Sequence, residues 1–295
     1  MSTLPIENAK KFTDLSVITE APDSAVLLIH DGSGVKQISA ANLKKDVKEL
    51  INTAQATINA IATTGAGAHN AIYRGKSLGS AVTEVQWAAI KAGTFEDMYI
   101  GDYWTIGGVV YRIAAFDYYY RAGDTDMTTH HVTLVPDANM YTHVMNDTNI
   151  TTGAYVGSKM YTEGLTQAKT TINSAFGEAH VLNHRQYLQN ATTDGYASGG
   201  SWYDSTVELM TEQNVYGGKI FSNIQNGTAL ANSYTVDKSQ YPLFAFRPDM
   251  ISNRQWFWLR DVVSASDFAR VHHAGNATSS GASAAAGVRP AFSIC

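Results

Sequence analysis

The amino-acid sequence predicts an α+β protein in three parts: an N-terminal β-hairpin arm, a short oligomerising helix and a larger C-terminal domain. An Asp-Gly turn separates two β-prone runs near the N-terminus, and a heptad-like spacing of apolar residues follows it. The rest of the chain mixes helical and alternating segments. We place the arm at residues 1–42, the helix at 43–65, a linker at 66–80 and the C-terminal domain at 81–295.

The arm contains a predicted hairpin at residues 24–38. The apolar run SAVLLIH is followed by the turn sequence DGSG and by VKQI, in which apolar and polar residues alternate. Asp-Gly between β-prone runs is the strongest short-range indication of a hairpin. Residues 1–23 are polar and show little periodicity, so no element is predicted there.

The arm leads into a helix that either Ser39 or Asn42 can cap and that runs to about Ala62. Apolar residues form a stripe along it, and we take as trimerisation residues Val47, Leu50, Ala54 and Ile61. The alternative is an amphipathic helix that packs on its own domain. The small residues that follow the helix leave little neighbouring chain to cover the stripe, which favours association with further copies; the stripe alone does not fix their number, and we take a homotrimer as the expected state.

The C-terminal domain is predicted element by element from periodicity and turn residues. The predicted elements are a helix over residues 81–92, a hairpin over 102–115, a strand over 130–135 and a helix over 159–175. The aromatic run WFWLRD then predicts a buried strand, and GVRPAF predicts a strand at the C-terminus. Between these two, residues 264–286 are small, polar and without a regular pattern, as in a surface presented by a scaffold.

Charge and cysteine content exclude several classes of protein. The net charge of −5 and the isoelectric point of about 6.0 lack the basic footprint of nucleic-acid binding. The only cysteine, Cys295, excludes a disulfide within the chain and a cysteine-based metal site. No secretory leader and no apolar stretch of membrane-spanning length is visible. We therefore expect a protein made in the cytoplasm, which, if it works outside the cell, must leave by lysis or as part of a particle.

The sequence carries no motif of nucleophilic catalysis, phosphate binding or dinucleotide binding, so we expect neither an enzyme nor a cofactor. His180 and His184 have the spacing of two ligands on one helical face. A zinc peptidase needs Glu after the first histidine, however, and Val181 stands there. A packing role is therefore favoured over metal binding. Paired carboxylates can lie far apart in sequence, which leaves glycoside hydrolysis as an open alternative.

Several C-terminal segments carry a family resemblance. WFWLRDVVSASDF, GNA, AS and GVRPAF resemble the variable region of retroelement-diversified phage receptor-binding proteins of the major-tropism-determinant type. Upstream, GDYWTIGGVVYRIAAFDYYY, LNHRQYL, SWYDSTVELM and FRPDMISNRQW are similar to the bodies of their lectin-like domains. VLLIHDGSGVKQISAANL resembles the start of phage fibre proteins. The resemblance implies a C-type-lectin-like fold for residues 81–295, with a variable region at about 255–292.

The resemblance also implies which positions bind ligand. Such retroelements mutate template adenines, so that Asn codons scatter into a set that excludes Lys, Glu, Gln, Met and Trp. The implied ligand-binding positions, which all hold permitted residues, are Asp267, Arg270, His272, His273, Ala274, Asn276, Thr278, Ser279, Ser280, Gly281, Ala284 and Ala286. The interleaved unvaried positions are Phe268, Ala269, Val271, Gly275, Ala277, Ala282, Ser283 and Gly287.

The function that the resemblance implies is that of a virion-attached adhesin. It would bind a bacterial surface protein or glycan as a homotrimer, and dock on other virion proteins through residues 1–42. Arg270, His272 and His273 would supply cationic or hydrogen-bonding contacts. The calcium-ligand triplets Glu-Pro-Asn and Trp-Asn-Asp of C-type lectins are absent, so we expect no metal. The alternatives are a structural or decorating fibre protein without specific receptor binding and a carbohydrate-active enzyme on a fibre.

Overall fold

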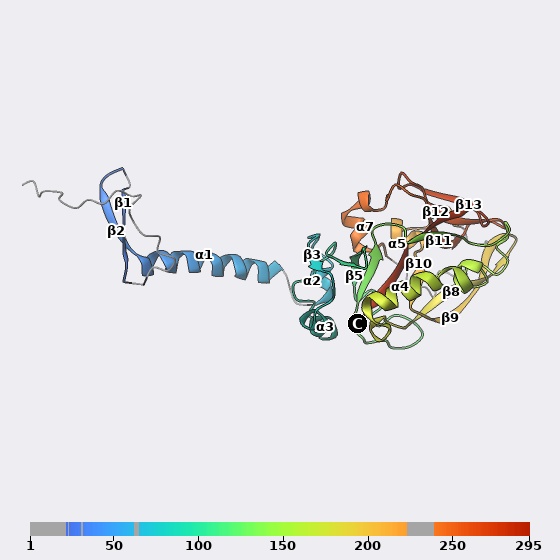
Figure 1. Ribbon diagram of the computed structural model, residues 1–295, viewed down its shortest axis with the longest axis horizontal. Helices are drawn as coiled ribbons and strands as arrows, with labels where there is room; N and C mark the ends of the chain where they lie inside the picture. The colour runs from blue at the N-terminus through green and yellow to red at the C-terminus, as the bar shows by residue number, and fades with distance from the viewer. Residues whose placement is uncertain (1–21, 23, 31, 62–64, 223–238) are drawn as a thin grey trace, which may run out of the picture. The chain divides into compact units, whose positions relative to one another are not determined.

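A computed structural model of the chain has a mixed α+β architecture (Figure 1). The residues that it describes are 22, 24–30, 32–61, 65–222 and 239–295. The chain divides into two compact units, Met1–Ala62 and Thr63–Cys295, and each is described by itself. The first half of the predicted virion-docking arm, residues 1–21, lies outside the described residues.

The first unit begins with the hairpin that the sequence predicts. Strand β1 (Val26–His30) pairs antiparallel with β2 (Val35–Ser39), and the register joins Val26 to Ser39 and His30 to Val35. Gly32 in the turn has a φ of 84°, a conformation that glycine adopts without steric cost. The glycine after the Asp is therefore what lets the chain reverse here.

Helix α1 (Ala40–Ile61) follows the hairpin without a break. The backbone N–H of Asn42 donates to Ser39 Oγ at 3.1 Å. Of the two predicted caps, Ser39 therefore serves, because its side chain satisfies one of the free N–H groups of the first turn. The helix consequently starts before residue 43, the boundary expected from the sequence.

The apolar stripe of α1 is exposed within its unit. Val47 is 50% exposed and Leu50 is 71% exposed, and Ile51 beside them is 59% exposed. Ala54 is also exposed, whereas the side chain of Ile61 lies outside the described residues. The described part of the first unit therefore leaves this stripe uncovered, and the packing of the helix against its own unit does not explain it.

The second unit contains two sheets and a long hairpin (Figure 1). The six-stranded sheet has the order β10 (Val207–Leu209), β15 (Pro290–Ile294), β6 (Val132–Pro136), β5 (Val109–Phe116), β4 (Tyr103–Ile106) and β3 (Ser77–Gly79). The five-stranded sheet has the order β13 (Ala277–Gly281), β12 (Asp267–Val271), β11 (Phe257–Val262), β14 (Ala285–Val288) and β7 (Tyr141–Val144). The separate hairpin is β8 (His184–Thr193) with β9 (Tyr196–Ser205).

Short helices join these strands. They are α2 (Ala66–His69), α3 (Glu84–Lys91), the π-helix η2 (Met160–Gly164), α4 (Thr166–Phe176), the 3-10 helix η3 (Glu178–His180), α5 (Glu212–Tyr216), α7 (Pro242–Phe246) and the 3-10 helix η4 (Pro248–Met250). A capping box of Thr83 and Gln86 starts α3. Gly177, at a φ of 85°, ends α4. The predicted helices over 81–92 and 159–175 are thus present, the second in two parts.

The five-stranded sheet lies between two hydrophobic core clusters. In β11, Phe257 and Leu259 belong to the first cluster, which includes much of the six-stranded sheet, and Trp258 belongs to the second. Successive residues of a strand point to opposite faces. Strand β11 is therefore buried on both sides, which confirms the buried strand predicted from WFWLRD and gives the C-terminal part of the chain a rigid centre.

Residues 66–80 are part of the second unit and are not a linker. The ring of His69 is buried and its Nδ1 lies 2.5 Å from Met98 O. Arg74 pairs with the buried carboxylate of Asp102. The sequence did not indicate this, because the segment is rich in small residues and its partners lie farther along the chain.

Residues 264–286 also differ from expectation. The segment is not irregular: β12 and β13 form an antiparallel hairpin, and β14 continues the same sheet. Its Ser, Thr and Ala residues carry no apolar alternation of their own. The sheet forms here because β12 pairs with the buried strand β11. Among the described residues, no helix is both long and apolar enough to cross a bilayer.

Candidate functional site

The hairpin of β12 and β13 brings most of the expected ligand-binding positions together. Arg270 pairs with Thr278, Phe268 with Ser280 and Ala269 with Ser279. Directly paired residues project from the same face of a sheet. Strand β13 is an edge strand, so the hairpin stands at the margin of the five-stranded sheet.

Burial separates most of the expected variable positions from five of the eight expected frame positions, whereas Gly275 and Ala277 are half-buried and Ser283 is exposed. Phe268, Ala269, Val271 and Ala282 have no exposed surface, and Gly287 is buried as well. The variable positions that reach the surface, fully or in part, are Asp267, Arg270, His272, His273, Ala274, Asn276, Thr278, Ser279, Ser280, Gly281 and Ala284. Side chains can therefore change at these positions while the anchoring residues between them stay in the cores.

At two of the expected variable positions, Ala286 and Gly281, the surroundings leave little room for other side chains. Ala286 is only 3% exposed and belongs to the second core cluster with Trp258. It is thus corrected from a ligand-binding position to a core position, because β14 lies inside the sheet. At Gly281, an added Cβ would lie 2.6 Å from Asn149 Oδ1. A side chain there would displace Asn149.

The frame positions Gly275 and Ser283 hold the ends of the hairpin. Gly275, at a φ of 94°, closes the turn after β12, where its N–H donates to His272 O and its carbonyl accepts from Tyr216 Oη. At the other end, Asn149 Oδ1 accepts from the N–H and the hydroxyl of Ser283, at 2.9 and 2.7 Å. Both ends of the hairpin are therefore tied to segments outside it.

An aromatic and cationic group of side chains, which we call the Trp256 cluster, lies at the turn end of the hairpin. It consists of Trp256, Arg270, His272 and His273. The guanidinium carbon of Arg270 lies 3.9 Å from the centre of the indole ring. The imidazole of His272 meets the indole edge-to-face at 4.0 Å between ring centres and lies 3.9 Å from the ring of His273. The family resemblance implied the three variable members but not that Trp256 would join them.

The electrostatic surroundings of the Trp256 cluster are positive. Burial lowers the pKa of Arg270, and the nearby Asp267 partly opposes this. The pKa of His272 is also lowered, first by its loss of contact with water and then by the charges of His273 and Arg270. For both residues, the surroundings disfavour the protonated, positively charged form. Arg270 Nε is buried and has no hydrogen-bond partner among the described residues.

A polar groove lies beside the opposite end of the hairpin. Its volume is about 380 Å³, and its lining residues are Asn146, Asp147, Thr148, Ile150, Thr152, Gly153, Gly157, Lys159, Thr162 and Glu163. Lys159 Nζ pairs with Asp147 Oδ1 at 2.6 Å. The backbone N–H of Asn146 donates to Ala282 O, so the groove adjoins the end of β13. No sequence motif indicated this groove, since it forms between loops.

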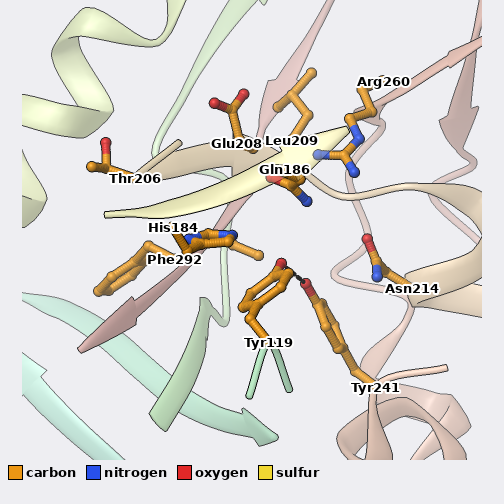
Figure 2. A pocket seen from close by; sticks show the side chains of 11 residues that line it. Tyr119, His184, Gln186, Thr206, Glu208, Leu209, Asn214, Tyr241, Arg260 and Phe292 are labelled. Carbon is orange, nitrogen blue, oxygen red and sulfur yellow. Dashed lines mark hydrogen bonds between the residues drawn. The ribbon is translucent and has the colours of Figure 1, made fainter. Parts of the chain in front are cut away.

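Figure 2 shows a second cavity, which is enclosed, between β8, β10 and the C-terminal strand. The rings of Tyr119 and His184 contact each other beside it, tilted by 33° with their centres 3.9 Å apart, and Tyr119 Oη lies 3.3 Å from Tyr241 Oη. Burial is the main reason that the pKa of His184 falls to about 3. The volume of about 10 Å³ is close to the least that one water molecule needs, so a larger ligand does not fit.

His180 and His184 lie in different elements. His180 ends η3, stacks on Trp87 at 4.0 Å and has its Nδ1 3.0 Å from Cys295 O. His184 begins β8 and faces the enclosed cavity. The two residues are thus not on one helical face. In the described part of the chain, no group of three or more His, Cys, Asp or Glu side chains has the arrangement of metal ligands.

Comparison with known protein families gives one match, to the C-terminal part of the chain. A family model described as "Domain of unknown function (DUF6273)" matches residues 178–295. No curated protein and no solved structure matches the chain. The matched residues include the whole β12–β13 hairpin and the Trp256 cluster, whereas the hairpin arm and α1 precede them.

Proposed function

We propose that this chain is a phage virion adhesin that binds a bacterial surface receptor through exposed residues of the β12–β13 hairpin. The observation that carries the proposal is the separation by burial within one short segment. Phe268, Ala269 and Val271 are completely buried, while their neighbours Asp267 and Arg270 reach the surface. A binding surface that is diversified by mutation needs this arrangement, because exposed side chains can then change without loss of the core.

The fold proposed for this role is C-type-lectin-like. The α+β architecture supports it, as does the internal position of the C-terminal strand β15, which lies between β10 and β6. Support also comes from the loops on both sides of the hairpin, which present groups for binding on a packed frame. Residues 178–295, the part matched by the family model, would then contain the receptor-binding surface.

The first unit would provide multivalency. Its exposed stripe of Val47, Leu50 and Ile51 supports a trimer, since uncovered apolar residues on a helix favour association with further copies. Residues 1–42 would attach the trimer to the virion. Linked binding sites gain from a high effective concentration. A surface made mainly of small side chains could thereby bind a cell firmly even though each single site is weak.

The test is to label intact bacteria of many strains with the full chain and with a triple variant in which Arg270, His272 and His273 are replaced by alanine. We expect the full chain to label some strains and the triple variant to lose that labelling at an unchanged melting temperature. The matched control replaces Lys91 and Lys169, two cations outside the hairpin, and should label like the unmodified protein.

Two outcomes would overturn the proposal. If the triple variant labels cells as well as the unmodified chain does, the hairpin is not the receptor site. If no strain is labelled, a structural or decorating role in the virion becomes the better explanation. Release of sugar fragments from the labelled cells would instead indicate an enzyme, and the carboxylates of the polar groove, Asp147 and Glu163, would then be the first residues to replace.

A further inference from the structure

We propose that the Trp256 cluster binds an anionic group of the receptor, a carboxylate or a phosphate, through the terminal amino groups of Arg270. The inference rests on the proposed function in that it names the chemistry of the receptor that the hairpin would bind. Its basis is the contrast between Arg270 and the other buried or half-buried arginines of the second unit.

Most arginines of this unit already have oxygen partners. The arginines that pair with an aspartate are Arg74, Arg112, Arg185 and Arg247. The fully buried Arg289 donates to three backbone carbonyls, those of Pro136, Met250 and Ile251. Arg270, by contrast, makes no hydrogen bond and no ion pair with any described residue, although part of it is buried.

An unpaired and partly buried guanidinium is energetically unfavourable. Its Nε–H has lost contact with water, and no acceptor among the described residues replaces it. A ligand that brings an anion would pair with the charge, and hydrogen bonds between charged partners are the stronger ones. The free protein thus holds a cation whose best partner is missing, and this favours a ligand that carries negative charge.

The geometry leaves the terminal amino groups of Arg270 available. The contact with Trp256, at 3.9 Å from guanidinium carbon to ring centre, restrains the side chain. Thr278 lies directly opposite on the edge strand and projects from the same face, where its hydroxyl can add a hydrogen bond. The imidazole of His272 lies against the same indole ring. A guanidinium, a hydroxyl and an imidazole are thus available to a ligand that binds beside Trp256.

The carboxylate of Asp267 does not lie on the side of the sheet that carries Arg270 and Thr278. Asp267 lies three residues before Arg270 in β12 and therefore projects from the opposite face. Its oxygens already accept from the hydroxyls of Ser266 at 2.7 Å and Ser279 at 3.4 Å. The anion that Arg270 lacks is consequently not supplied by its own strand, and we infer that the ligand supplies it.

The experiment measures binding of the full chain to three immobilised polymers: polygalacturonate with carboxylates, polyphosphate with phosphates, and neutral dextran. We expect retention on at least one anionic polymer and none on dextran. Arg270→Gln should weaken that retention by about tenfold or more, which corresponds to about 1.4 kcal/mol. Arg270→Lys keeps the charge but loses the planar pair of donors. Its retention should therefore lie between that of the unmodified chain and that of Arg270→Gln. Lys91→Ala is the matched control and should bind as the unmodified chain does.

The two anionic polymers distinguish an acidic polysaccharide from a phosphate polymer as the source of the group. Equal retention of the unmodified chain and Arg270→Gln, or no retention on either anionic polymer, would overturn the inference. Labelling of bacteria is measured in parallel, so that the two proposals fail separately. If labelling needs the hairpin but is insensitive to Arg270→Gln, the adhesin proposal stands and the anion site does not. If Arg270 is needed for polymer retention and no cell is labelled, the anion site stands and the adhesin proposal does not.

Discussion

At the scale of single residues, neighbours in the chain have opposite environments. Phe268 is completely buried, whereas Arg270, two positions later on the same face of β12, reaches the surface beside Trp256. The difference arises because the face of the sheet is covered by the second core cluster at one end and not at the other. Strand periodicity alone would have placed the two side chains in the same environment.

The buried position of Ala286 leads to a prediction about stability. Ala286→Leu adds volume to a packed cluster beside Trp258, so we expect it to lower the free energy of unfolding by about 1–3 kcal/mol. Ala274→Leu, at an exposed position of the turn, should change it by less than about 0.5 kcal/mol. Denaturant unfolding of both variants measures the difference. Equal stability of the two would mean that position 286 is open to diversification after all.

The buried ring of His184 leads to a prediction about pH. Its pKa falls to about 3 in the folded protein, against an ordinary value of 6.5. The unfolded chain therefore takes up the proton first as the pH falls. The stability that neutral His184 contributes is complete above pH 6.5 and is lost progressively between pH 6.5 and about 3, by roughly 5 kcal/mol at most.

Replacement of this histidine isolates the effect. We expect His184→Gln to be less stable than the unmodified protein at pH 7.5, and the gap between them to shrink as the pH is lowered to 4.5. Denaturant unfolding at a series of pH values gives the measurement, with His273→Gln as a control for the substitution itself. A gap that stays constant over this range would show that His184 is not the titrating group.

At the scale of elements, α1 has a surface without a partner in its own unit. Replacing both Val47 and Leu50 by lysine should convert an oligomer into a monomer, because the apolar contact between copies would become a charged one. Light scattering coupled to size-exclusion chromatography reports the mass in solution. Asn52→Lys adds charge to the same helix outside the proposed trimer contacts and should leave the mass unchanged. A monomeric unmodified protein would refute the trimer.

The β12–β13 hairpin is the element that the sequence describes least well. Its small polar residues have no strand pattern, and it is ordered by its partners: β11 in the sheet, Asn149 at Ser283 and Tyr216 at the turn. This supports its proposed role, because an element held by outside contacts depends little on the identity of its exposed side chains. The same reasoning explains why its ligand-binding positions come from a family resemblance and not from periodicity.

At the scale of the whole molecule, the division into two units predicts that residues 63–295 fold without the rest. The isolated fragment should unfold at the same denaturant concentration as the second unit of the full chain, and it should be monomeric. Its labelling of bacteria should fall sharply through loss of multivalency. Fusion to an unrelated trimeric coiled coil should restore labelling. Failure of the fragment to fold would show that the first unit is needed for the core.

The elements that sequence reasoning found are those with local causes. An Asp-Gly turn between β-prone runs gives the β1–β2 hairpin, Ser39 caps α1, Gly177 ends α4, and an aromatic run makes β11 a buried strand. Each depends on residues close together in the chain, where turn and capping chemistry acts. The α+β class follows from the mixture of such elements.

The sequence by itself thus determined the class of fold, the separate helix and the place of the C-terminal strands. Only the tertiary structure decided that residues 66–80 belong to the folded unit, that Ala286 is in the core, and that Arg270 rests on Trp256 without an oxygen partner. The physical reason is that burial and charge pairing depend on which distant segments meet. Those contacts leave no period in the chain, whereas turns, caps and apolar runs act through neighbours a few residues away.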